Sequence, residues 1–178
     1  MTDTAFEMSS LQKLLGVAKV KGKTGDVDVA TLEGKIILVY FSAHWCPPCR
    51  AFTPMLAKFY ENLKSKRDDF EIIFVSSDRN QEEFEDYYRE HPWLAHPFKN
   101  RQDANIVSTV FGVRGIPTLA VVDGQGKTIT TQGRDFVLAD PQGKLFPWKD
   151  EQPKTPFRLP GFVWVILFII AWMIFRRM

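Results

Sequence analysis

The chain has 178 residues, of which 45% are hydrophobic and 25% charged, so it can bury a core and is not disordered by composition. Its 23 basic and 21 acidic side chains give a formal net charge of +2, which argues against a nucleic-acid-binding protein with a strongly basic face. Two cysteines exclude both a disulfide-dense secreted scaffold and a zinc site built from cysteines alone.

The first half of the chain predicts short elements followed by a central strand. Ser9 or Ser10 is suited to cap a short helix of leucines at helical spacing, which glycines 22 and 25 interrupt. Alternating apolar residues over 27–32 predict a strand. Residues 36–42 (IILVYFS) are continuously branched or aromatic, which indicates a central strand buried on both faces.

Helices and strands then alternate. A helix is expected at 47–64, with Pro47 in its first turn and Pro54 as an interior kink. After this helix the pattern predicts a strand at 70–77, a polar helix at 81–90, an irregular stretch at 91–98, a helix at 104–111, a strand at 118–122, a hairpin turn at 123–126, a strand at 128–131, a helix at 133–139 and a coil. This order predicts an α/β fold with a mixed sheet.

Cys46 and Cys49 stand between the predicted central strand and the following helix, in the sequence WCPPC. Two intervening residues place Cys46 at the helix start and Cys49 one turn inside, close enough for a disulfide. Unpaired backbone N–H groups and the helix dipole favour the thiolate of Cys46. We therefore expect Cys46 to attack a substrate disulfide and Cys49 to resolve the mixed disulfide.

Two other interpretations of the cysteine pair remain open at this point. The pair can be half of a zinc site completed by His44, His91 or His96, or it can be two inert core thiols. The chain lacks a second cysteine pair, and buried structural thiols do not need prolines between them. The first observation disfavours a zinc site and the second disfavours inert thiols, so a redox-active dithiol is the favoured interpretation.

Several motifs together resemble the thioredoxin superfamily: WCPPC after a strand, Pro54 in the helix, and GIPTL (115–119) before a strand. Within it the chain resembles the tryparedoxins of trypanosomatid parasites over residues 5–150. The matching stretches are YFSAHWCPPCRAFTP, DYYREHPWLAHPF, FGVRGIPTL and DPQGKLFPWKD. WCPPC is shared with nucleoredoxins, so the joint pattern carries the resemblance.

The resemblance implies a thioredoxin-like fold and an electron relay. Trypanothione, a bis-glutathionyl spermidine dithiol, would reduce the disulfide between Cys46 and Cys49. The resulting dithiol would reduce protein disulfides, such as those of 2-Cys peroxiredoxins. Neither a bound cofactor nor a metal is expected.

The resemblance also assigns substrate-binding residues. Pro117 is expected to be cis and to face the cysteines, with the backbone of Ile116 free to pair with substrate, although an ordinary turn is the alternative. Trp45 is expected to be a flat lid beside the nucleophile, next to Pro47 and Pro48.

Two arginines, Arg50 and Arg134, match family positions near the site. Their guanidinium groups are suited to attract the carboxylates of trypanothione, and a solvated surface role is the alternative for each.

Tyr40 occupies the position, six residues before the first cysteine, where many thioredoxins bury an aspartate for proton transfer. A tyrosine with a pKa near 10 is a poor base at neutral pH, so deprotonation of Cys49 needs another route, such as water. His44 is expected to be an exposed loop residue or to tune Cys46. Three further aromatic residues are expected to pack rather than contact substrate: Tyr87, Tyr88 and Trp93.

The C-terminal part of the chain has a different composition. Residues 162–175 (FVWVILFIIAWMIF) form an apolar run without a polar face, which disfavours the alternative of a helix packed on the domain. The stretch from Arg158 to Arg176 is at the low end of the length that spans a bilayer. We therefore expect a catalytic domain at 1–152, a proline-containing linker at 153–161 and a single transmembrane helix as C-terminal anchor at 162–175.

The N-terminus shows neither a signal-peptide nor a presequence pattern, so we expect the domain to face the cytosol. A short anchor with a basic tip suits the mitochondrial outer membrane, with the endoplasmic reticulum as alternative. The expected function is that of a membrane-tethered dithiol–disulfide oxidoreductase. The alternatives are a nucleoredoxin-like redox-regulated binding protein and a bacterial envelope thioredoxin-like protein, which would need an N-terminal signal or anchor.

Overall fold

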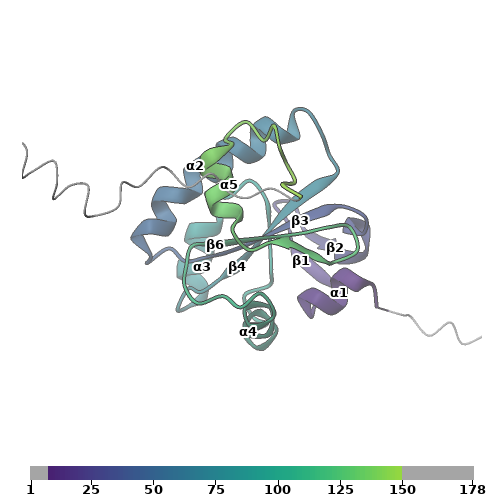
Figure 1. Ribbon diagram of the computed structural model, residues 1–178. Coiled ribbons are helices and arrows are strands. Elements are labelled where there is room, and N and C mark those ends of the chain that lie inside the picture. Colours follow the sequence, from purple (N-terminus) through teal and green to yellow (C-terminus); the bar gives the residue numbers. More distant parts are fainter. Residues whose placement is uncertain (1–7, 150–178) are drawn as a thin grey trace, which may run out of the picture.

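The computed structural model describes residues 8–149, which form a seven-stranded mixed sheet with helices on both faces (Figure 1). The strand order is β2-β1-β5-β4-β3-β6-β7. The strands are β1 (Lys19–Lys21), β2 (Asp26–Asp28), β3 (Ile36–Ser42), β4 (Phe70–Ser76), β5 (Leu94–Ala95), β6 (Thr118–Val122) and β7 (Thr128–Thr130). The α-helices are α1 (Ser10–Leu15), α2 (Pro47–Lys64), α3 (Gln81–Tyr88), α4 (Arg101–Val110) and α5 (Gly133–Ala139).

The centre of the sheet is built from β3, β4 and β6. β3 and β4 are parallel, and their register pairs Ser42 with Ser76, so both strands end at the same edge of the sheet. β6 runs antiparallel on the other side of β3. The mixed sheet expected from the sequence is confirmed, and the edge where β3 and β4 end carries the cysteine motif.

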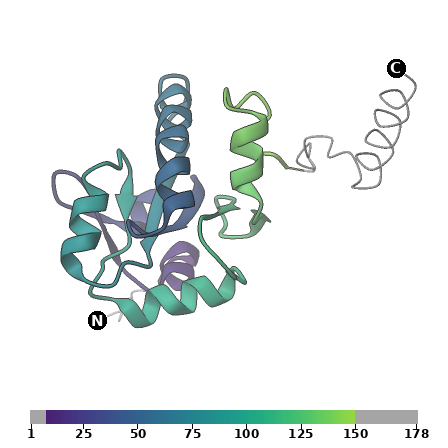
Figure 2. The ribbon, with the colours of Figure 1, turned by 90° about the vertical axis from the view of Figure 1, so that its left-hand side faces the viewer.

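Two hydrophobic clusters lie on opposite faces of the sheet because side chains alternate along each strand. Leu38 and Tyr40 of β3 pack in the cluster that α2, α3 and α5 cover, whereas Val39 and Phe41 pack in the cluster beneath α1 and α4. Figures 1 and 2 show α2 and α5 on one side of the sheet and α1 and α4 on the other. Both faces of the central strands are therefore closed to water.

Several short elements differ from the sequence-based expectation. Residues 27–32 are not one strand: β2 ends at Asp28, whose carboxylate accepts the N–H of Ala30 and caps a 3₁₀ helix at Val29–Leu32. α1 ends at Gly16, which has a left-handed φ of 69°, so the expected stop at glycine 22 is wrong. The two-residue β5 lies inside the stretch expected to be irregular.

The segment after α5, expected to be a coil, closes the core. Phe146 and Trp148 are 6% and 1% exposed, and the Trp148 ring stacks on Phe136 at 5.2 Å. The Trp148 indole N–H donates to the carboxylate of Asp140 at 3.1 Å. This segment is therefore a structural part of the domain.

Within residues 8–149 no helix is long and apolar enough to cross a membrane. The expected linker at 153–161 and anchor at 162–175 lie outside the described residues.

His91 is a buried histidine whose two ring nitrogens have no hydrogen-bond partner. Its ring lies 4.4 Å from the ring of Tyr87, 4.5 Å from Phe74 and 5.0 Å from Trp93. Burial, with a smaller contribution from the positive charge of Lys23, lowers the pKa of His91 to about 3. The fold therefore holds this imidazole in its neutral form.

We expect His91 to make the fold acid-sensitive. Its unfolded pKa is about 6.5, so protons bind preferentially to the unfolded chain as pH falls from about 6.5 towards 3. Between pH 7.5 and pH 5 this group should lower the free energy of unfolding by about 2 kcal/mol. Urea unfolding across that range should show a shallower pH dependence for His91→Leu than for wild type. Parallel curves would contradict the assignment, because the other titrating groups are the same in both proteins.

Candidate active site

The two cysteines form a disulfide at the start of α2, directly after β3. Their Cα atoms lie 5.2 Å apart, and Cys46 and Cys49 are 4% and 0% exposed. Cys46 is the residue before the first helical turn, and its carbonyl accepts the N–H groups of Cys49 and Arg50 at 3.0 and 3.1 Å. Pro47 and Pro48 fill the first two helical positions, where a missing N–H costs nothing.

The segment before β6 faces the disulfide. The sulfur of Cys46 lies 3.8 Å from the carbonyl oxygen of Ile116, and the Ile116–Pro117 peptide bond is cis, as expected. Pro117 is buried and has no N–H to offer. β6 delivers this segment to the cysteines because it pairs with β3, the strand that ends before them.

The β4–α3 loop (residues 77–80) holds the segment before Cys46 in place. The backbone N–H of His44 donates to Asp78 at 2.6 Å, and the indole N–H of Trp45 donates to the carbonyl of Ser77 at 3.0 Å. The guanidinium of Arg79 lies over the Trp45 ring, 5.5 Å from its centroid. Trp45 is nevertheless 45% exposed, so it presents one apolar surface to a substrate beside the disulfide.

Asp78 is a buried carboxyl group that the sequence reasoning missed. It is 2% exposed, and its second oxygen accepts the hydroxyl of Ser76 at 2.7 Å. Burial raises the pKa of Asp78, and the hydrogen bonds from Ser76 and from the N–H of His44 partly oppose that rise. The sequence does predict β3 and β4 as central strands. Had they been paired in parallel, the residues that follow β4, Asp78 among them, would have been expected beside the residues that follow β3.

A network of buried hydroxyl groups lies behind Cys49. Thr53, four residues further along α2, donates its hydroxyl to the Cys49 carbonyl at 3.1 Å. Its oxygen lies 2.9 Å from the hydroxyl of Tyr40 and 2.5 Å from that of Tyr87, and Ser42 lies 3.0 Å from each tyrosine hydroxyl. Burial raises the pKa of Tyr40, so its hydroxyl stays protonated and holds the network together rather than acting as a base.

The remaining predicted residues differ in how far they are exposed. Arg50 and Arg134 are exposed on α2 and α5, and neither takes part in an ion pair among the described residues. His44 is half-buried and stacks on Tyr87 at 5.4 Å, which differs from an exposed loop residue. The expected packing residues are all buried: Tyr87, Tyr88 and Trp93.

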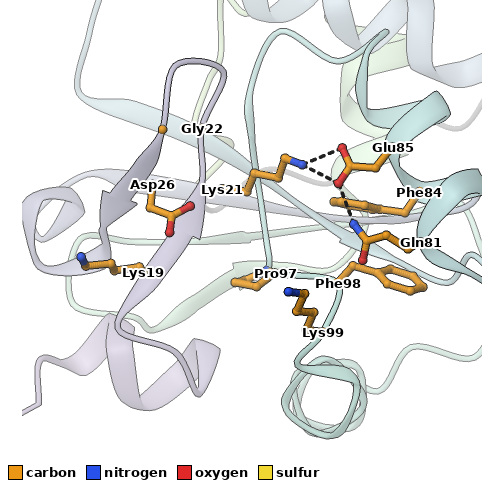
Figure 3. Close-up of a pocket in the computed structure, with 11 residues that line it drawn as sticks. Lys19, Lys21, Gly22, Asp26, Gln81, Phe84, Glu85, Pro97, Phe98 and Lys99 are labelled. Atoms are coloured by element: carbon orange, nitrogen blue, oxygen red, sulfur yellow. Dashed lines mark hydrogen bonds and ion pairs between the residues drawn. The ribbon is translucent and has the colours of Figure 1, made fainter.

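Away from the disulfide, the described part of the chain has surface hollows but no metal site. Among residues 8–149 no group of three His, Cys, Asp or Glu side chains is placed to hold a metal ion. A hollow of about 670 Å³ lies between β1, α3 and the segment after β5, and it contains none of the predicted site residues. In it Lys21 points towards Glu85 and forms an ion pair at 2.5 Å (Figure 3).

The sulfur atoms of Cys46 and Cys49 lie at the start of a helix, opposite the carbonyl of Ile116 and next to Pro117, which has no N–H. This arrangement can carry out thiol–disulfide exchange. Fold and site together define a thiol–disulfide oxidoreductase. A sequence profile described as thioredoxin-like matches residues 34–128, and the chain belongs to this family.

Within this family, the chain is similar to tryparedoxins over nearly their full length. A tryparedoxin of Trypanosoma brucei brucei is 46% identical over 143 residues, which cover 79% of this chain and 99% of the relative. The structure of a tryparedoxin II complexed with glutathionylspermidine is 44% identical, with a TM-score of 0.75 over 80% of this chain and all of that one. Mouse nucleoredoxin is 48% identical over 122 residues, but these cover 68% of this chain and 28% of the nucleoredoxin.

Proposed function

We propose that this protein is a dithiol–disulfide oxidoreductase of the tryparedoxin type, which passes electrons from trypanothione to protein disulfides such as those of 2-Cys peroxiredoxins. The observation that carries the proposal is the disulfide between Cys46 and Cys49, which faces the Ile116 carbonyl. The chain that holds it matches nearly the full length of a tryparedoxin. The bound glutathionylspermidine in a related tryparedoxin supports a glutathione-derived thiol as reductant.

In the proposed cycle, one thiolate of trypanothione attacks the Cys46–Cys49 disulfide, and its second thiolate releases the reduced protein and leaves trypanothione disulfide. Cys46 then attacks a protein disulfide, and the leaving sulfur takes up a proton. Cys49 attacks the mixed disulfide, which restores the starting disulfide and releases the second substrate thiol. Two electrons and two protons therefore pass from trypanothione to the substrate.

The substrate surface of the proposal consists of residues around the sulfur of Cys46. The exposed indole of Trp45 and the backbone of Ile116 flank that sulfur, and an extended substrate segment can pair with the Ile116 backbone. The other proposed contacts are Pro47, Pro48 and Pro117, with Arg50 and Arg134 as partners for carboxylates.

A nucleoredoxin-like binding protein, whose dithiol controls partner docking, is the second candidate because nucleoredoxins are about as similar in sequence. The chain spans little more than a quarter of those relatives' length. Reduction of a peroxiredoxin disulfide by catalytic amounts of the protein, with trypanothione as electron source and glutathione as matched donor, separates the two. Many turnovers with trypanothione support the oxidoreductase, whereas stoichiometric partner capture without turnover supports the binder.

We also propose that residues 162–175 tether a domain of residues 1–152 through the linker at 153–161, with the domain facing the cytosol at the mitochondrial outer membrane. The support is the apolar run followed by Arg176 and Arg177. Fluorescent fusions with and without residues 153–178 test the tether. A diffuse signal from both fusions would reject the tether. A reticular signal from the full chain would show that the membrane is that of the endoplasmic reticulum.

A further inference from the structure

Arg79 places a positive charge over the exposed indole of Trp45, the residue that precedes the proposed nucleophile Cys46. The guanidinium carbon lies 5.5 Å from the centroid of that ring. Within residues 8–149 no carboxylate forms an ion pair with the guanidinium: the nearby Glu83 instead accepts the backbone N–H of Arg79 at 3.0 Å. The side chain is exposed, so its N–H groups are open to a ligand.

The indole beneath this charge is held in place by the surrounding contacts. The Trp45 indole N–H is held by the carbonyl of Ser77, and the backbone of His44 is held by Asp78. The carbonyl of Ser76 accepts a hydrogen bond from Arg101 at 2.8 Å, which ties the start of the β4–α3 loop to α4. An indole held this way loses little freedom when a substrate binds.

A guanidinium stacked on an aromatic ring keeps its N–H edge free for hydrogen bonding. That edge matches the two oxygens of a carboxylate, which accept two parallel hydrogen bonds. The indole beneath it offers an apolar surface, and the stacking itself favours the flat cation. Arg79 and Trp45 together therefore fit a carboxylate that is attached close to a sulfur atom.

We propose that Arg79 and Trp45 form a subsite for a carboxylate of the disulfide substrate, so that the protein prefers disulfides with a carboxylate near the sulfur. This inference rests on the proposed oxidoreductase function. The reaction is the exchange already described: the dithiol is oxidised to the Cys46–Cys49 disulfide, and the substrate disulfide is reduced to two thiols. Arg79 binds the substrate and takes no part in the transfer of electrons or protons.

The test uses the prereduced full chain and three small disulfides that differ in charge. These are oxidised glutathione, which carries carboxylates, bis(2-hydroxyethyl) disulfide, which is neutral, and cystamine, which is cationic. The second-order rate constant of each is measured for wild type and for Arg79→Gln, Arg79→Glu and Arg79→Lys. Arg89→Glu serves as the matched charge control, because Arg89 lies at the far end of α3 and pairs with Asp86 instead.

We expect Arg79→Gln to lower the rate with oxidised glutathione, relative to the neutral disulfide, by roughly two- to fivefold, which corresponds to one exposed charge pair. Arg79→Glu should lower it further and raise the relative rate with cystamine. Arg79→Lys should retain part of the preference, because it keeps the charge but not the planar fork. Arg89→Glu should leave the relative rates within about twofold of wild type.

Unchanged relative rates in the Arg79 variants would overturn the subsite while leaving the oxidoreductase intact. Equal losses in Arg79→Glu and Arg89→Glu would also overturn it, since they would reflect the overall charge. The rate with the neutral disulfide reports whether each variant keeps its fold and its dithiol. A wild-type protein that reduces none of the three disulfides would instead reject the proposed function.

Discussion

Replacing Cys46 by serine is expected to lower the rate of disulfide reduction at least about a thousandfold, the largest effect of any single substitution in this chain. A serine hydroxyl is not ionised at neutral pH and cannot form a disulfide, so both the nucleophile and the redox couple are lost. Thiol release from bis(2-hydroxyethyl) disulfide by the prereduced protein measures the effect. Met55→Ser, a serine substitution at an exposed position of the same helix, is the control and should retain wild-type rates.

The Cys49→Ser variant separates attack from resolution. It should still form the first bond to substrate, because Cys46 precedes the helix and is the more exposed of the two residues. It should then stop as a mixed disulfide, which mass spectrometry detects as one half of the substrate added to the protein. Accumulation of that adduct in Cys46→Ser rather than in Cys49→Ser would reverse the assigned roles.

The second large effect is expected at Trp148, whose replacement by alanine should lower the free energy of unfolding by about 3–5 kcal/mol. The ring stacks on Phe136 and on Phe59, and packs edge-on against Phe146 at 5.1 Å. Its removal leaves a cavity between α2 and α5 and takes one hydrogen bond from the Asp140 carboxylate, which still accepts the backbone N–H groups of Lys144 and Leu145. Urea unfolding followed by far-ultraviolet circular dichroism measures the loss.

Two further variants keep this prediction testable if the alanine variant does not fold. Trp148→Phe keeps the aromatic stack but loses the indole N–H, and should cost about 1–2 kcal/mol. Leu145→Ala changes a neighbouring side chain that is 52% exposed, and should cost less than about 0.5 kcal/mol. Equal losses for Leu145→Ala and Trp148→Phe would show that the segment is not part of the core.

The long elements were predicted well because each carries its own signal. The bounds of β3, α2, β6 and α5 agree with the sequence-based expectation residue for residue. Continuous branched runs mark buried strands, and the proline-rich motif marks the start of α2. The short strand β1 was missed and β2 was misjudged, because a strand of three residues shows too little of the alternating pattern and its pairing with neighbouring strands decides its structure.

The sequence by itself determined the cysteine motif, the order of the central elements and the family, because these depend on local spacing and on runs of apolar residues. The family resemblance placed the segment of Ile116 and Pro117 opposite the cysteines, but only the tertiary structure placed Asp78 and Arg79 against the segment that carries Trp45. The physical reason is strand pairing: β4 and β6 flank β3, so segments far apart in the chain meet where β3 ends. No local pattern in the sequence records that meeting.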